Sequence, residues 1–517
     1  MSAVLDRLLS DGRLLGVLVG LGVMVVLLLV WAQTQKGSGS RGPAIDAERE
    51  QSGLWASAGA VRDMWAAPKG PADPRRMVIG EMDGRVLVSD PHRSILVLAP
   101  TGAGKTPRVV VPTVLRHQGP AVIASVKADV LALTGDHRRS VGPVWVFDPS
   151  QSMGETARWS PLATIRTWAD ALSAAGWIQA AAKTDGRGLE GQKFWDDEAE
   201  KLLAPLMLLV ARRGGLMGDV FSILAHLDAQ QDAVTSALAE LDSDAGNHWA
   251  LFCSLELRTR TSVVATASNV FKAWSHPLVA SAVNVRAGDP GVFDIGELLE
   301  SGGSLYLVAP SSTQAEFKAV YETLVNAILR AVEDRYARSA RPLSPPLLLM
   351  LDEAANIAPL RHLDVVASSM AGMGVCTVTV WQDEAQIEKI YGREAARVIM
   401  ANHGTRLYLA GISDPRTLEQ LSRAIGRDFV ERSNGAGRSW HEIEVAPPHW
   451  VRQLAPGEAV AISGNRPPMR VRLVGWFEDK VLRAQIPMGV QMAFDADFQQ
   501  EPSRGRRLLE RIAAVRS

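Results

Sequence analysis

The chain has 517 residues, of which 47% are hydrophobic, so it is long enough to form two or more packed domains. Its formal net charge of −1 excludes the global basic character of many nucleic-acid-binding proteins, so any DNA contact must be local. Cys253 and Cys376 are the only cysteines and lack CxxC spacing, so the sequence supports neither a disulfide framework nor a zinc site. Because disulfides are rare in the cytosol, we expect the bulk of the chain to lie there.

An uncharged apolar segment lies near the amino terminus. The 19 residues from Leu14 to Ala32 can cross a hydrocarbon core of ~30 Å at ~1.5 Å per residue, with Trp31 at the interface. A cleaved signal peptide is the alternative, but its apolar region is normally ~7–15 residues long. We therefore predict a transmembrane helix within residues 1–33, which anchor the chain in the membrane.

Residues 34–75 have the composition of a tether. They contain the flexible run Gly37-Ser38-Gly39-Ser40 and several prolines, without a sustained hydrophobic period. The folded body is then expected to open with a short strand at Arg85 to Ser89.

A buried strand followed by a glycine-rich loop is the most informative pattern of the chain. Ile95 to Leu98 is a short apolar run of the kind found in buried parallel strands. It leads into Thr101-Gly102-Ala103-Gly104-Lys105-Thr106, which resembles a Walker A phosphate loop except that Ala99 replaces the first glycine of the full pattern. An ordinary glycine-rich turn between strand and helix is the alternative.

Each part of this loop has a chemical task in binding a nucleotide. Gly102 and Gly104 let backbone N–H groups turn toward an anion, and Lys105 reaches the terminal phosphates. The Thr106 hydroxyl can bind Mg²⁺. The loop therefore predicts ATP and Mg²⁺ as cofactors.

The next large segment has helical character. Residues 165–288 lack strand-like runs, and the spacing of apolar residues is helical in Glu198 to Arg212 and Ala233 to Leu241. Lys105 and Asp352 are 247 residues apart, whereas a βα unit takes ~30 residues. We predict an all-helical domain at 165–288, inserted between core parts at 76–164 and 289–480, with a tail at 481–517.

Two groups of residues would suit nucleic acid but have commoner roles. The basic tail from Arg504 to Arg516 is by default a solvated helix, although DNA, acidic lipid or a partner could bind it. Stacking on DNA bases is possible for a cluster of tryptophans, but core packing is the more frequent role: Trp159, Trp168, Trp177, Trp195, Trp249 and Trp274.

Two further strands end in polar side chains that complete a nucleotide site. Leu347 to Leu351 precedes Asp352 and Glu353, a Walker B pattern in which Asp352 would hold Mg²⁺ through water and Glu353 would activate the attacking water. Val375 to Trp381 ends at Gln382, where a γ-phosphate sensor would lie in an open α/β sheet. We predict Glu353, Lys105 and Gln382 as catalytic groups, and Thr106 and Asp352 as metal ligands.

The remaining elements continue the alternation of strands and helices. Strands are expected at Ser304 to Ala309, Thr405 to Leu409 and Ala459 to Ile462, and a helix at Phe317 to Tyr336. The fold class is therefore α/β, with a mostly parallel sheet covered by helices on both faces.

Several segments, taken in order, resemble the conjugative coupling proteins of type IV secretion, the TraG/TraD-like DNA-transfer ATPases. They are APTGAGKT, KFWDDEAEKLLAPLMLLV, LDEAANIAPL, WQDEAQIEKIYG and ANHGTRLYL, and the resemblance runs from about Ile79 to Phe477. Two positions depart from the family pattern: Ala354 stands where an aromatic residue is usual, and Ala128 replaces the glycine of a K-G-D/E element.

The resemblance implies roles for residues and for the whole protein. The family's nucleotide-binding residues correspond to Lys105 and Thr106, its acidic pair to Asp352 and Glu353, and its glutamine to Gln382. It implies a RecA-like ATPase core in a homohexamer that is anchored in the cytoplasmic (inner) membrane, with the ATPase in the cytosol. Such coupling proteins commonly carry two membrane helices, so the single-pass anchor expected at Leu14 to Ala32 departs from the family. The implied substrate is a relaxase with attached single-stranded DNA, delivered to a type IV secretion channel.

Such hexamers complete each site with an arginine from the neighbouring subunit. The candidates that follow the acidic pair are Arg361, Arg397, Arg406 and Arg423.

Two alternative functions stay open. One is an FtsK-like double-stranded DNA translocase, but the short tail has no space for the DNA-reading module of such a protein. The other is a nucleotide-switched membrane scaffold for protein secretion, and ATP turnover stimulated by DNA would argue against it.

Overall fold

The structure is a computed structural model, and it describes residues 52–66, 73–182, 190–286, 288–310, 314–355, 360–433 and 438–498. The predicted membrane span at 14–32, the first part of the tether and the basic tail lie outside the described residues. Among the residues that are described, no helix is both long enough and apolar enough to cross a bilayer.

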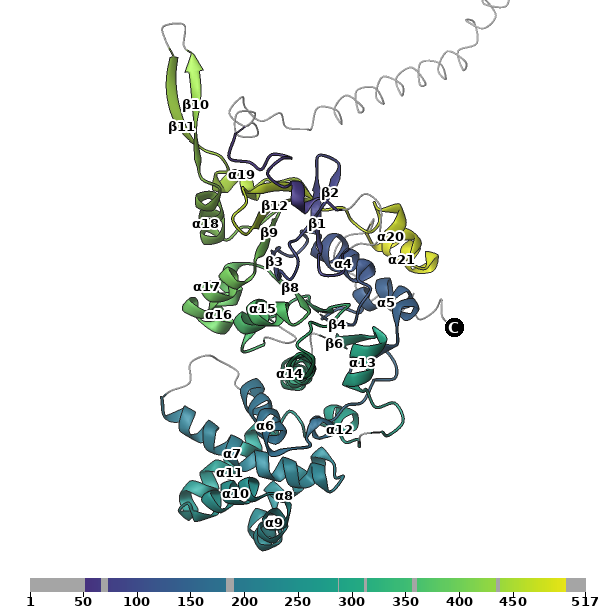
Figure 1. Cartoon of the computed structure of the whole chain (residues 1–517), viewed down its shortest axis with the longest axis vertical. Helices are drawn as coiled ribbons and strands as arrows, with labels where there is room; N and C mark the ends of the chain where they lie inside the picture. Colours follow the sequence, from purple (N-terminus) through teal and green to yellow (C-terminus); the bar gives the residue numbers. More distant parts are fainter. Residues whose placement is uncertain are drawn as a thin grey trace, which may run out of the picture. The chain divides into compact units, whose positions relative to one another are not determined.

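An 11-stranded sheet forms the centre of the larger of two compact units, in the order β2-β1-β13-β12-β9-β3-β8-β7-β4-β6-β5 (Figure 1). Its strands are β1 (Val78–Met82), β2 (Arg85–Val88), β3 (Ile95–Leu98), β4 (Ala121–Ser125), β5 (Val144–Phe147), β6 (Ser304–Val308), β7 (Leu347–Leu351), β8 (Val375–Trp381), β9 (Thr405–Leu409), β12 (Glu458–Ser463) and β13 (Met469–Arg472).

Neighbouring strands from β9 to β5 are parallel, which confirms the predicted mostly parallel sheet. Every residue of β3, β4, β6, β7 and β8 is buried, because helices cover both faces of the sheet. This is why these strands appear in the sequence as mostly apolar runs, with only small polar residues such as Ser304 and Thr377 among them.

The prediction for Ala459 to Ile462 was wrong in direction. This strand, β12, pairs antiparallel with β9, with Val460 opposite Tyr408, and it continues antiparallel into β13, β1 and β2. A short connection joins β12 to β13, and a hairpin joins β1 to β2, so this flank of the sheet needs no crossover helices.

Helices pack on both sides of the sheet. Figure 1 shows α4 (Val111–Arg116), α5 (Asp129–Val141), α20 (Lys480–Ala484) and α21 (Met488–Phe498) on one side. The other side carries α15 (Leu363–Gly372), α16 (Glu384–Tyr391) and α17 (Arg393–Asn402). The predicted boundary of a tail at 481 falls inside α20, whose Leu482 joins a small apolar core with Leu115 of α4 and Leu133 of α5.

The described part of the segment between β5 and β6 contains helices and no strand, apart from one isolated β-bridge between Arg158 and Val292. The helices are η3 (Pro161–Thr164), α6 (Trp168–Ala182), α7 (Glu190–Arg212), α8 (Met217–Ala225), α9 (Leu227–Leu241), α10 (Ser243–Ser254), α11 (Leu257–Val270), α12 (Pro277–Val283) and α13 (Ile295–Ser301). Helix α6 packs against α7 and against α14 (Gln314–Ser339), which follows β6. The domain boundaries at 165 and 288 stay a prediction.

Three of the clustered tryptophans are core residues. Trp159, Trp249 and Trp274 are almost fully buried, so their rings cannot stack on DNA bases in this conformation.

Part of the predicted tether is folded. Val61 and Met64, at the 3₁₀ helix η1 (Arg62–Met64), are fully buried in the main core beneath the sheet edge. Only these two apolar side chains anchor the segment, and they do not repeat with the spacing of a helix or a strand. The sequence therefore gave no periodic signal that the segment is folded.

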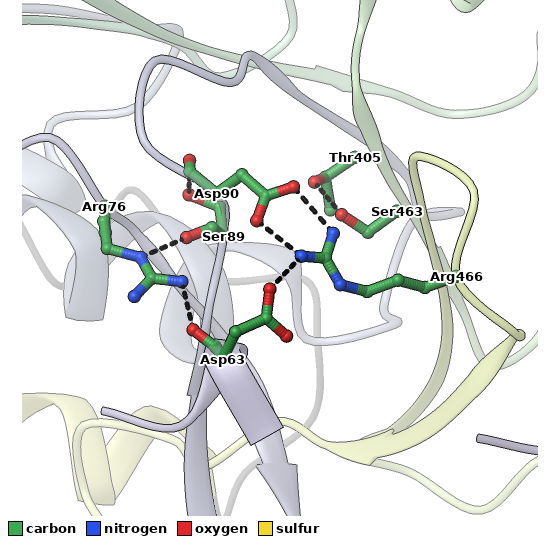
Figure 2. Close-up of polar contacts among 7 residues, drawn as sticks. All are labelled: Asp63, Arg76, Ser89, Asp90, Thr405, Ser463 and Arg466. Atoms are coloured by element: carbon green, nitrogen blue, oxygen red, sulfur yellow. Dashed lines mark hydrogen bonds and ion pairs between the residues drawn. The ribbon is translucent and has the colours of Figure 1, made fainter. Parts of the chain in front are cut away.

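An ion-pair cluster fastens this segment to the antiparallel flank (Figure 2). The Arg466 guanidinium, in the β12–β13 connection, donates to both carboxylate oxygens of Asp90 at 2.7 and 2.9 Å and also to Asp63. Arg76 donates to the backbone oxygens of Ser89 at 2.7 Å and Asp63 at 2.8 Å. These charge-assisted contacts join segments that are distant in sequence.

The smaller unit contains a two-stranded hairpin, β10 (Arg427–Ser433) and β11 (Arg438–Glu444), in full antiparallel register. Phe429 is 61% exposed and Trp440 is 67% exposed. At its base, Ser52 Oγ donates to Asp428 Oδ2 at 2.6 Å. This hairpin was not predicted from the sequence, although the sequence between its strands contains Asn434-Gly435, a frequent hairpin-turn dipeptide.

Two helices flank the hairpin in sequence and belong to the larger unit. They are α18 (Pro415–Ile425), which Asp414 caps by accepting from the Thr417 N–H at 2.8 Å, and α19 (Pro448–Arg452). Both helices begin with proline at the first turn, where the missing N–H needs no partner.

Candidate active site

The glycine-rich loop adopts a conformation that depends on its glycines. Gly102 has φ +84° and Gly104 has φ +81°, a left-handed region in which other residues are strained. A Cβ at Gly104 would also lie 3.2 Å from Arg108 Cδ, whereas space is open around Gly102, where the dihedral angle alone requires glycine. The loop then enters a short π-helical turn, η2 (Thr106–Val110), with Pro107 in its first turn.

The strand order brings the two predicted halves of the site together. Strands β3, β8 and β7 are parallel neighbours, so their carboxyl ends meet at one edge of the sheet. Lys105 Nζ lies 3.3 Å from Glu353 Oε1, and Thr106 Oγ1 lies 3.5 Å from Asp352 Oδ2. These four side chains, predicted from separate motifs, form one cluster.

Asp352 has the environment of a cation ligand. It is 5% exposed, and burial raises the pKa of its carboxyl to about 7, with Lys105 opposing this shift and Asp129 and Glu353 adding to it. Its Oδ2 accepts from Ser125 Oγ at 3.3 Å, while Oδ1 has no hydrogen-bond partner among the described residues. A buried carboxylate oxygen without a partner beside the Thr106 hydroxyl fits Mg²⁺ bound together with nucleotide phosphates.

Glu353 has an unusual backbone conformation. Its φ is +63°, which costs a residue other than glycine about 1–2 kcal/mol. The flanking backbone fixes this geometry, because Asp352 N donates to Ala124 O at 2.9 Å and Ala354 N to Val380 O at 3.4 Å. Strain maintained by the surrounding structure is typical of functional positions.

Gln382 lies at the same edge, directly after β8 and beside β3. Its backbone N–H donates to Gln386 Oε1 at 2.9 Å, and Asp383 Oδ1 accepts from Gln386 N at 2.8 Å, which caps α16. The turn after β8 is therefore fixed at both ends. The role of the Gln382 amide as a phosphate sensor stays a prediction.

Neither the contact of Ser125 with the site nor a chemical role for Asp129 was predicted from the sequence. Ser125 ends β4, the strand next to β7, and Asp129 begins α5 two residues after Lys127. Burial raises the pKa of the Asp129 carboxyl, Lys127 opposes the shift, and Glu353 adds to it. A polar residue at the end of a third buried strand was the signal that could have located this part of the site.

The four candidate arginines lie in different settings. Arg361 N donates to Glu322 Oε1 at 3.1 Å, and Arg406 belongs to β9 opposite Leu96 of β3. Two are on exposed helix surfaces in ion pairs with neighbours one turn away: Arg397 with Glu394 at 3.3 Å and Arg423 with Glu419 at 3.0 Å. A role of any of them in a neighbouring subunit stays a prediction.

Known proteins resemble this chain over most of its length. A family model described as "Type IV secretory system Conjugative DNA transfer" matches residues 68–500. Protein VirD4 of Rhizobium rhizogenes is 25% identical over 431 residues, which cover 77% of this chain and 61% of VirD4. Conjugal transfer protein TraG of Escherichia coli is 28% identical over 375 residues, which cover 66% of this chain and 57% of TraG. The chain thus spans less than two thirds of the length of these curated relatives.

Solved structures share the fold. The bacterial conjugative coupling protein TrwBdeltaN70 in its unbound form has a TM-score of 0.61 at 21% identity, covering 81% of this chain and 92% of that chain. TrwB in complex with ADP and Mg²⁺ also gives a TM-score of 0.61 at 21% identity, with 81% and 93% covered. Because the family match includes the glycine-rich loop, the acidic pair and the strands that join them, the chain belongs to the type IV secretory system conjugative DNA transfer family.

Proposed function

We propose that the chain binds ATP with Mg²⁺ at loop 101–106 and hydrolyses it. The observation that carries this proposal is the convergence of Lys105 and Thr106 with Asp352 and Glu353 at one sheet edge. The solved complex of TrwB with ADP and Mg²⁺, which shares the fold, supports the choice of ligand. When bound, Mg²⁺ would supply positive charge that neutralises the negative charge developing on the phosphates during hydrolysis.

The contacts of the phosphate loop suggest how nucleotide binding prepares the site. Lys105 is paired with Glu353 at 3.3 Å, and both side chains are only partly exposed. Terminal phosphates would compete for the Lys105 ammonium and release the Glu353 carboxylate to accept a proton from the attacking water. Thr106 and Asp352 would hold Mg²⁺, and Gln382 would contact the γ-phosphate from the neighbouring strand end.

The family assigns this hydrolysis a task in DNA transfer. We infer that the protein is a membrane-anchored homohexamer of the cytoplasmic membrane, with Leu14 to Ala32 as its span and the ATPase in the cytosol. ATP hydrolysis would drive a relaxase-bound single DNA strand into a type IV secretion channel, with the helices α6–α12 facing the substrate. The named functions of TraG relatives in conjugal transfer support this inference.

ATPase measurements on the full-length protein in detergent test this proposal. We expect phosphate release to increase with added single-stranded DNA and, per protein, with protein concentration, because an arginine from a neighbouring subunit would complete each site. Lys105→Ala is the matched inactive control. Preference for duplex DNA would favour the FtsK-like translocase, and absence of turnover with intact ATP binding would favour the nucleotide-switched scaffold.

A further inference from the structure

A basic cavity of about 510 Å³ lies between α16, α17, α18 and β9, apart from the phosphate loop. Its size is within the range of ~300–1,000 Å³ typical of ligand pockets. Its charged and polar lining consists of Arg393, Arg397, Arg406, Arg416, Glu384, Glu388 and Gln420. The apolar part of the wall is formed by Ala396, Met400 and Ala401.

Positive charge exceeds negative charge in this lining, although the whole chain has a net charge of −1. Arg393 and Arg397 are one turn apart on α17, so both project from the same helix face. Two of the arginines already have carboxylate partners, because Arg416 pairs with Glu388 at 3.5 Å and Arg397 pairs with the exposed Glu394 at 3.3 Å, and a phosphate would compete with these exposed pairs. Glu384 is 6% exposed, and burial raises the pKa of its carboxyl to about 7, which weakens its negative charge near neutral pH.

The composition of the cavity indicates its ligand. Guanidinium groups bind phosphate through paired N–H donors, and arginine rather than lysine supplies every cation of this lining. The wall of Ala396, Met400 and Ala401 offers an apolar surface that a sugar or base can contact and that an inorganic anion would not use. A nucleotide unit has both features.

We propose that this cavity holds a nucleotide unit of the transported single DNA strand, with its phosphate on Arg393 and Arg397. This inference rests on the proposed function in DNA transfer and assigns the strand a contact site on the ATPase core. An acidic protein segment would satisfy the arginines but would make less use of the apolar wall, so nucleic acid is favoured.

The cavity is joined to the nucleotide site by short rigid connections. Glu384 follows Gln382 by two residues across the capped turn, and its N–H donates to Thr417 Oγ1 of α18 at 3.4 Å. Arg406 lies opposite Leu96 in β3, the strand that enters the phosphate loop. Two walls of the cavity are therefore connected to the nucleotide site, and we expect the affinity for DNA to differ between ATP-bound and ADP-bound protein.

The test compares the full-length protein with Arg393→Gln/Arg397→Gln. The control is Arg330→Gln/Arg335→Gln, which removes two exposed arginines of α14 outside the cavity. The readout is anisotropy of a labelled oligothymidine over a series of salt concentrations. We expect the cavity variant to bind about tenfold or more weakly, with a salt slope smaller by about 1.4 for two lost phosphate contacts. ATP affinity and melting temperature should match the control.

Each contrary result has a separate meaning. If wild-type protein binds no DNA, the proposed function fails and the inference fails with it. If wild type binds DNA and the cavity variant binds as the control does, only the inference is overturned.

Three further outcomes would replace the ligand assignment. If the variant keeps DNA binding but loses the dependence of ATPase activity on protein concentration, these arginines act between subunits. If polyglutamate binding, and not oligothymidine binding, is lost, the ligand is an acidic protein segment. If thymidine monophosphate at equal nucleotide concentration displaces the strand fully, the cavity binds a free nucleotide.

Discussion

Replacing Glu353 by Gln separates nucleotide binding from hydrolysis. The amide cannot accept the water proton, and removing a general base slows a reaction by about 10²–10⁴-fold, or about 3–5 kcal/mol in the barrier. ATP binding should persist, because Lys105, Thr106 and Asp352 are unchanged. The backbone strain at φ +63° is the same for Gln as for Glu.

The effect of Glu353→Gln on folding should be small by comparison. The Lys105–Glu353 pair is partly exposed, with side-chain exposures of 13% and 25%, so its loss should cost no more than about 1 kcal/mol. Phosphate release and the affinity for a fluorescent ATP analogue are the two measurements, with the exposed Glu394→Gln as control. Normal turnover by the Glu353 variant would show that the base lies elsewhere, and loss of ATP binding would show that Glu353 supports the loop.

Three further substitutions test other parts of the structure. Lys105→Ala should abolish ATP binding in equilibrium titrations, since Lys105 is the only cation of the loop; retained affinity would refute the site. Arg466→Met should lower the free energy of unfolding by about 1–2 kcal/mol and the melting temperature by a few degrees, because Asp90 loses two charge-assisted hydrogen bonds; an unchanged melting temperature would contradict this. Burial raises the pKa of Glu322 to about 7, above its ordinary 4.5, so ionising Glu322 in the folded state costs stability as pH rises through this window. The melting temperature of Glu322→Gln should therefore exceed that of wild type by an amount that grows from about pH 5 to about pH 8. A difference in melting temperature that does not depend on pH would contradict the raised pKa of Glu322.

The buried parallel strands were predictable because their environment leaves a direct trace in the sequence. Strands β3, β7 and β8 begin and end at the residues expected for them, since a strand covered on both faces is mostly apolar. Once these strands were placed in one parallel sheet, their carboxyl ends had to meet. The contact of Lys105 with Glu353 also requires β3 and β7 to lie on either side of β8, which the sequence does not show.

Features that depend on distant partners were not predictable in the same way. The direction of β12 is set by pairing with β9 and β13, and its own residues fit either direction. Arg138 has the sequence position of an ordinary basic residue near the end of a helix. Its guanidinium is instead fully buried and donates to Ser304 Oγ at 2.7 Å and to the Gly119 carbonyl at 2.6 Å.

Residues outside the sequence motifs also contribute to the candidate site and to the basic cavity. Ser125 contacts Asp352 only because β4 lies beside β7, which the sequence order of the strands does not show. The basic cavity is assembled from residues of β9 and three helices, and no local motif marks it.

DNA transfer between cells tests the central claim most directly. A donor strain of the native host that lacks this gene should regain plasmid transfer with the wild-type protein. It should remain deficient with Glu353→Gln, provided that both proteins reach the membrane fraction in equal amounts. Transfer at the wild-type frequency with the Glu353→Gln protein would contradict the claim that ATP hydrolysis at this site drives DNA transfer.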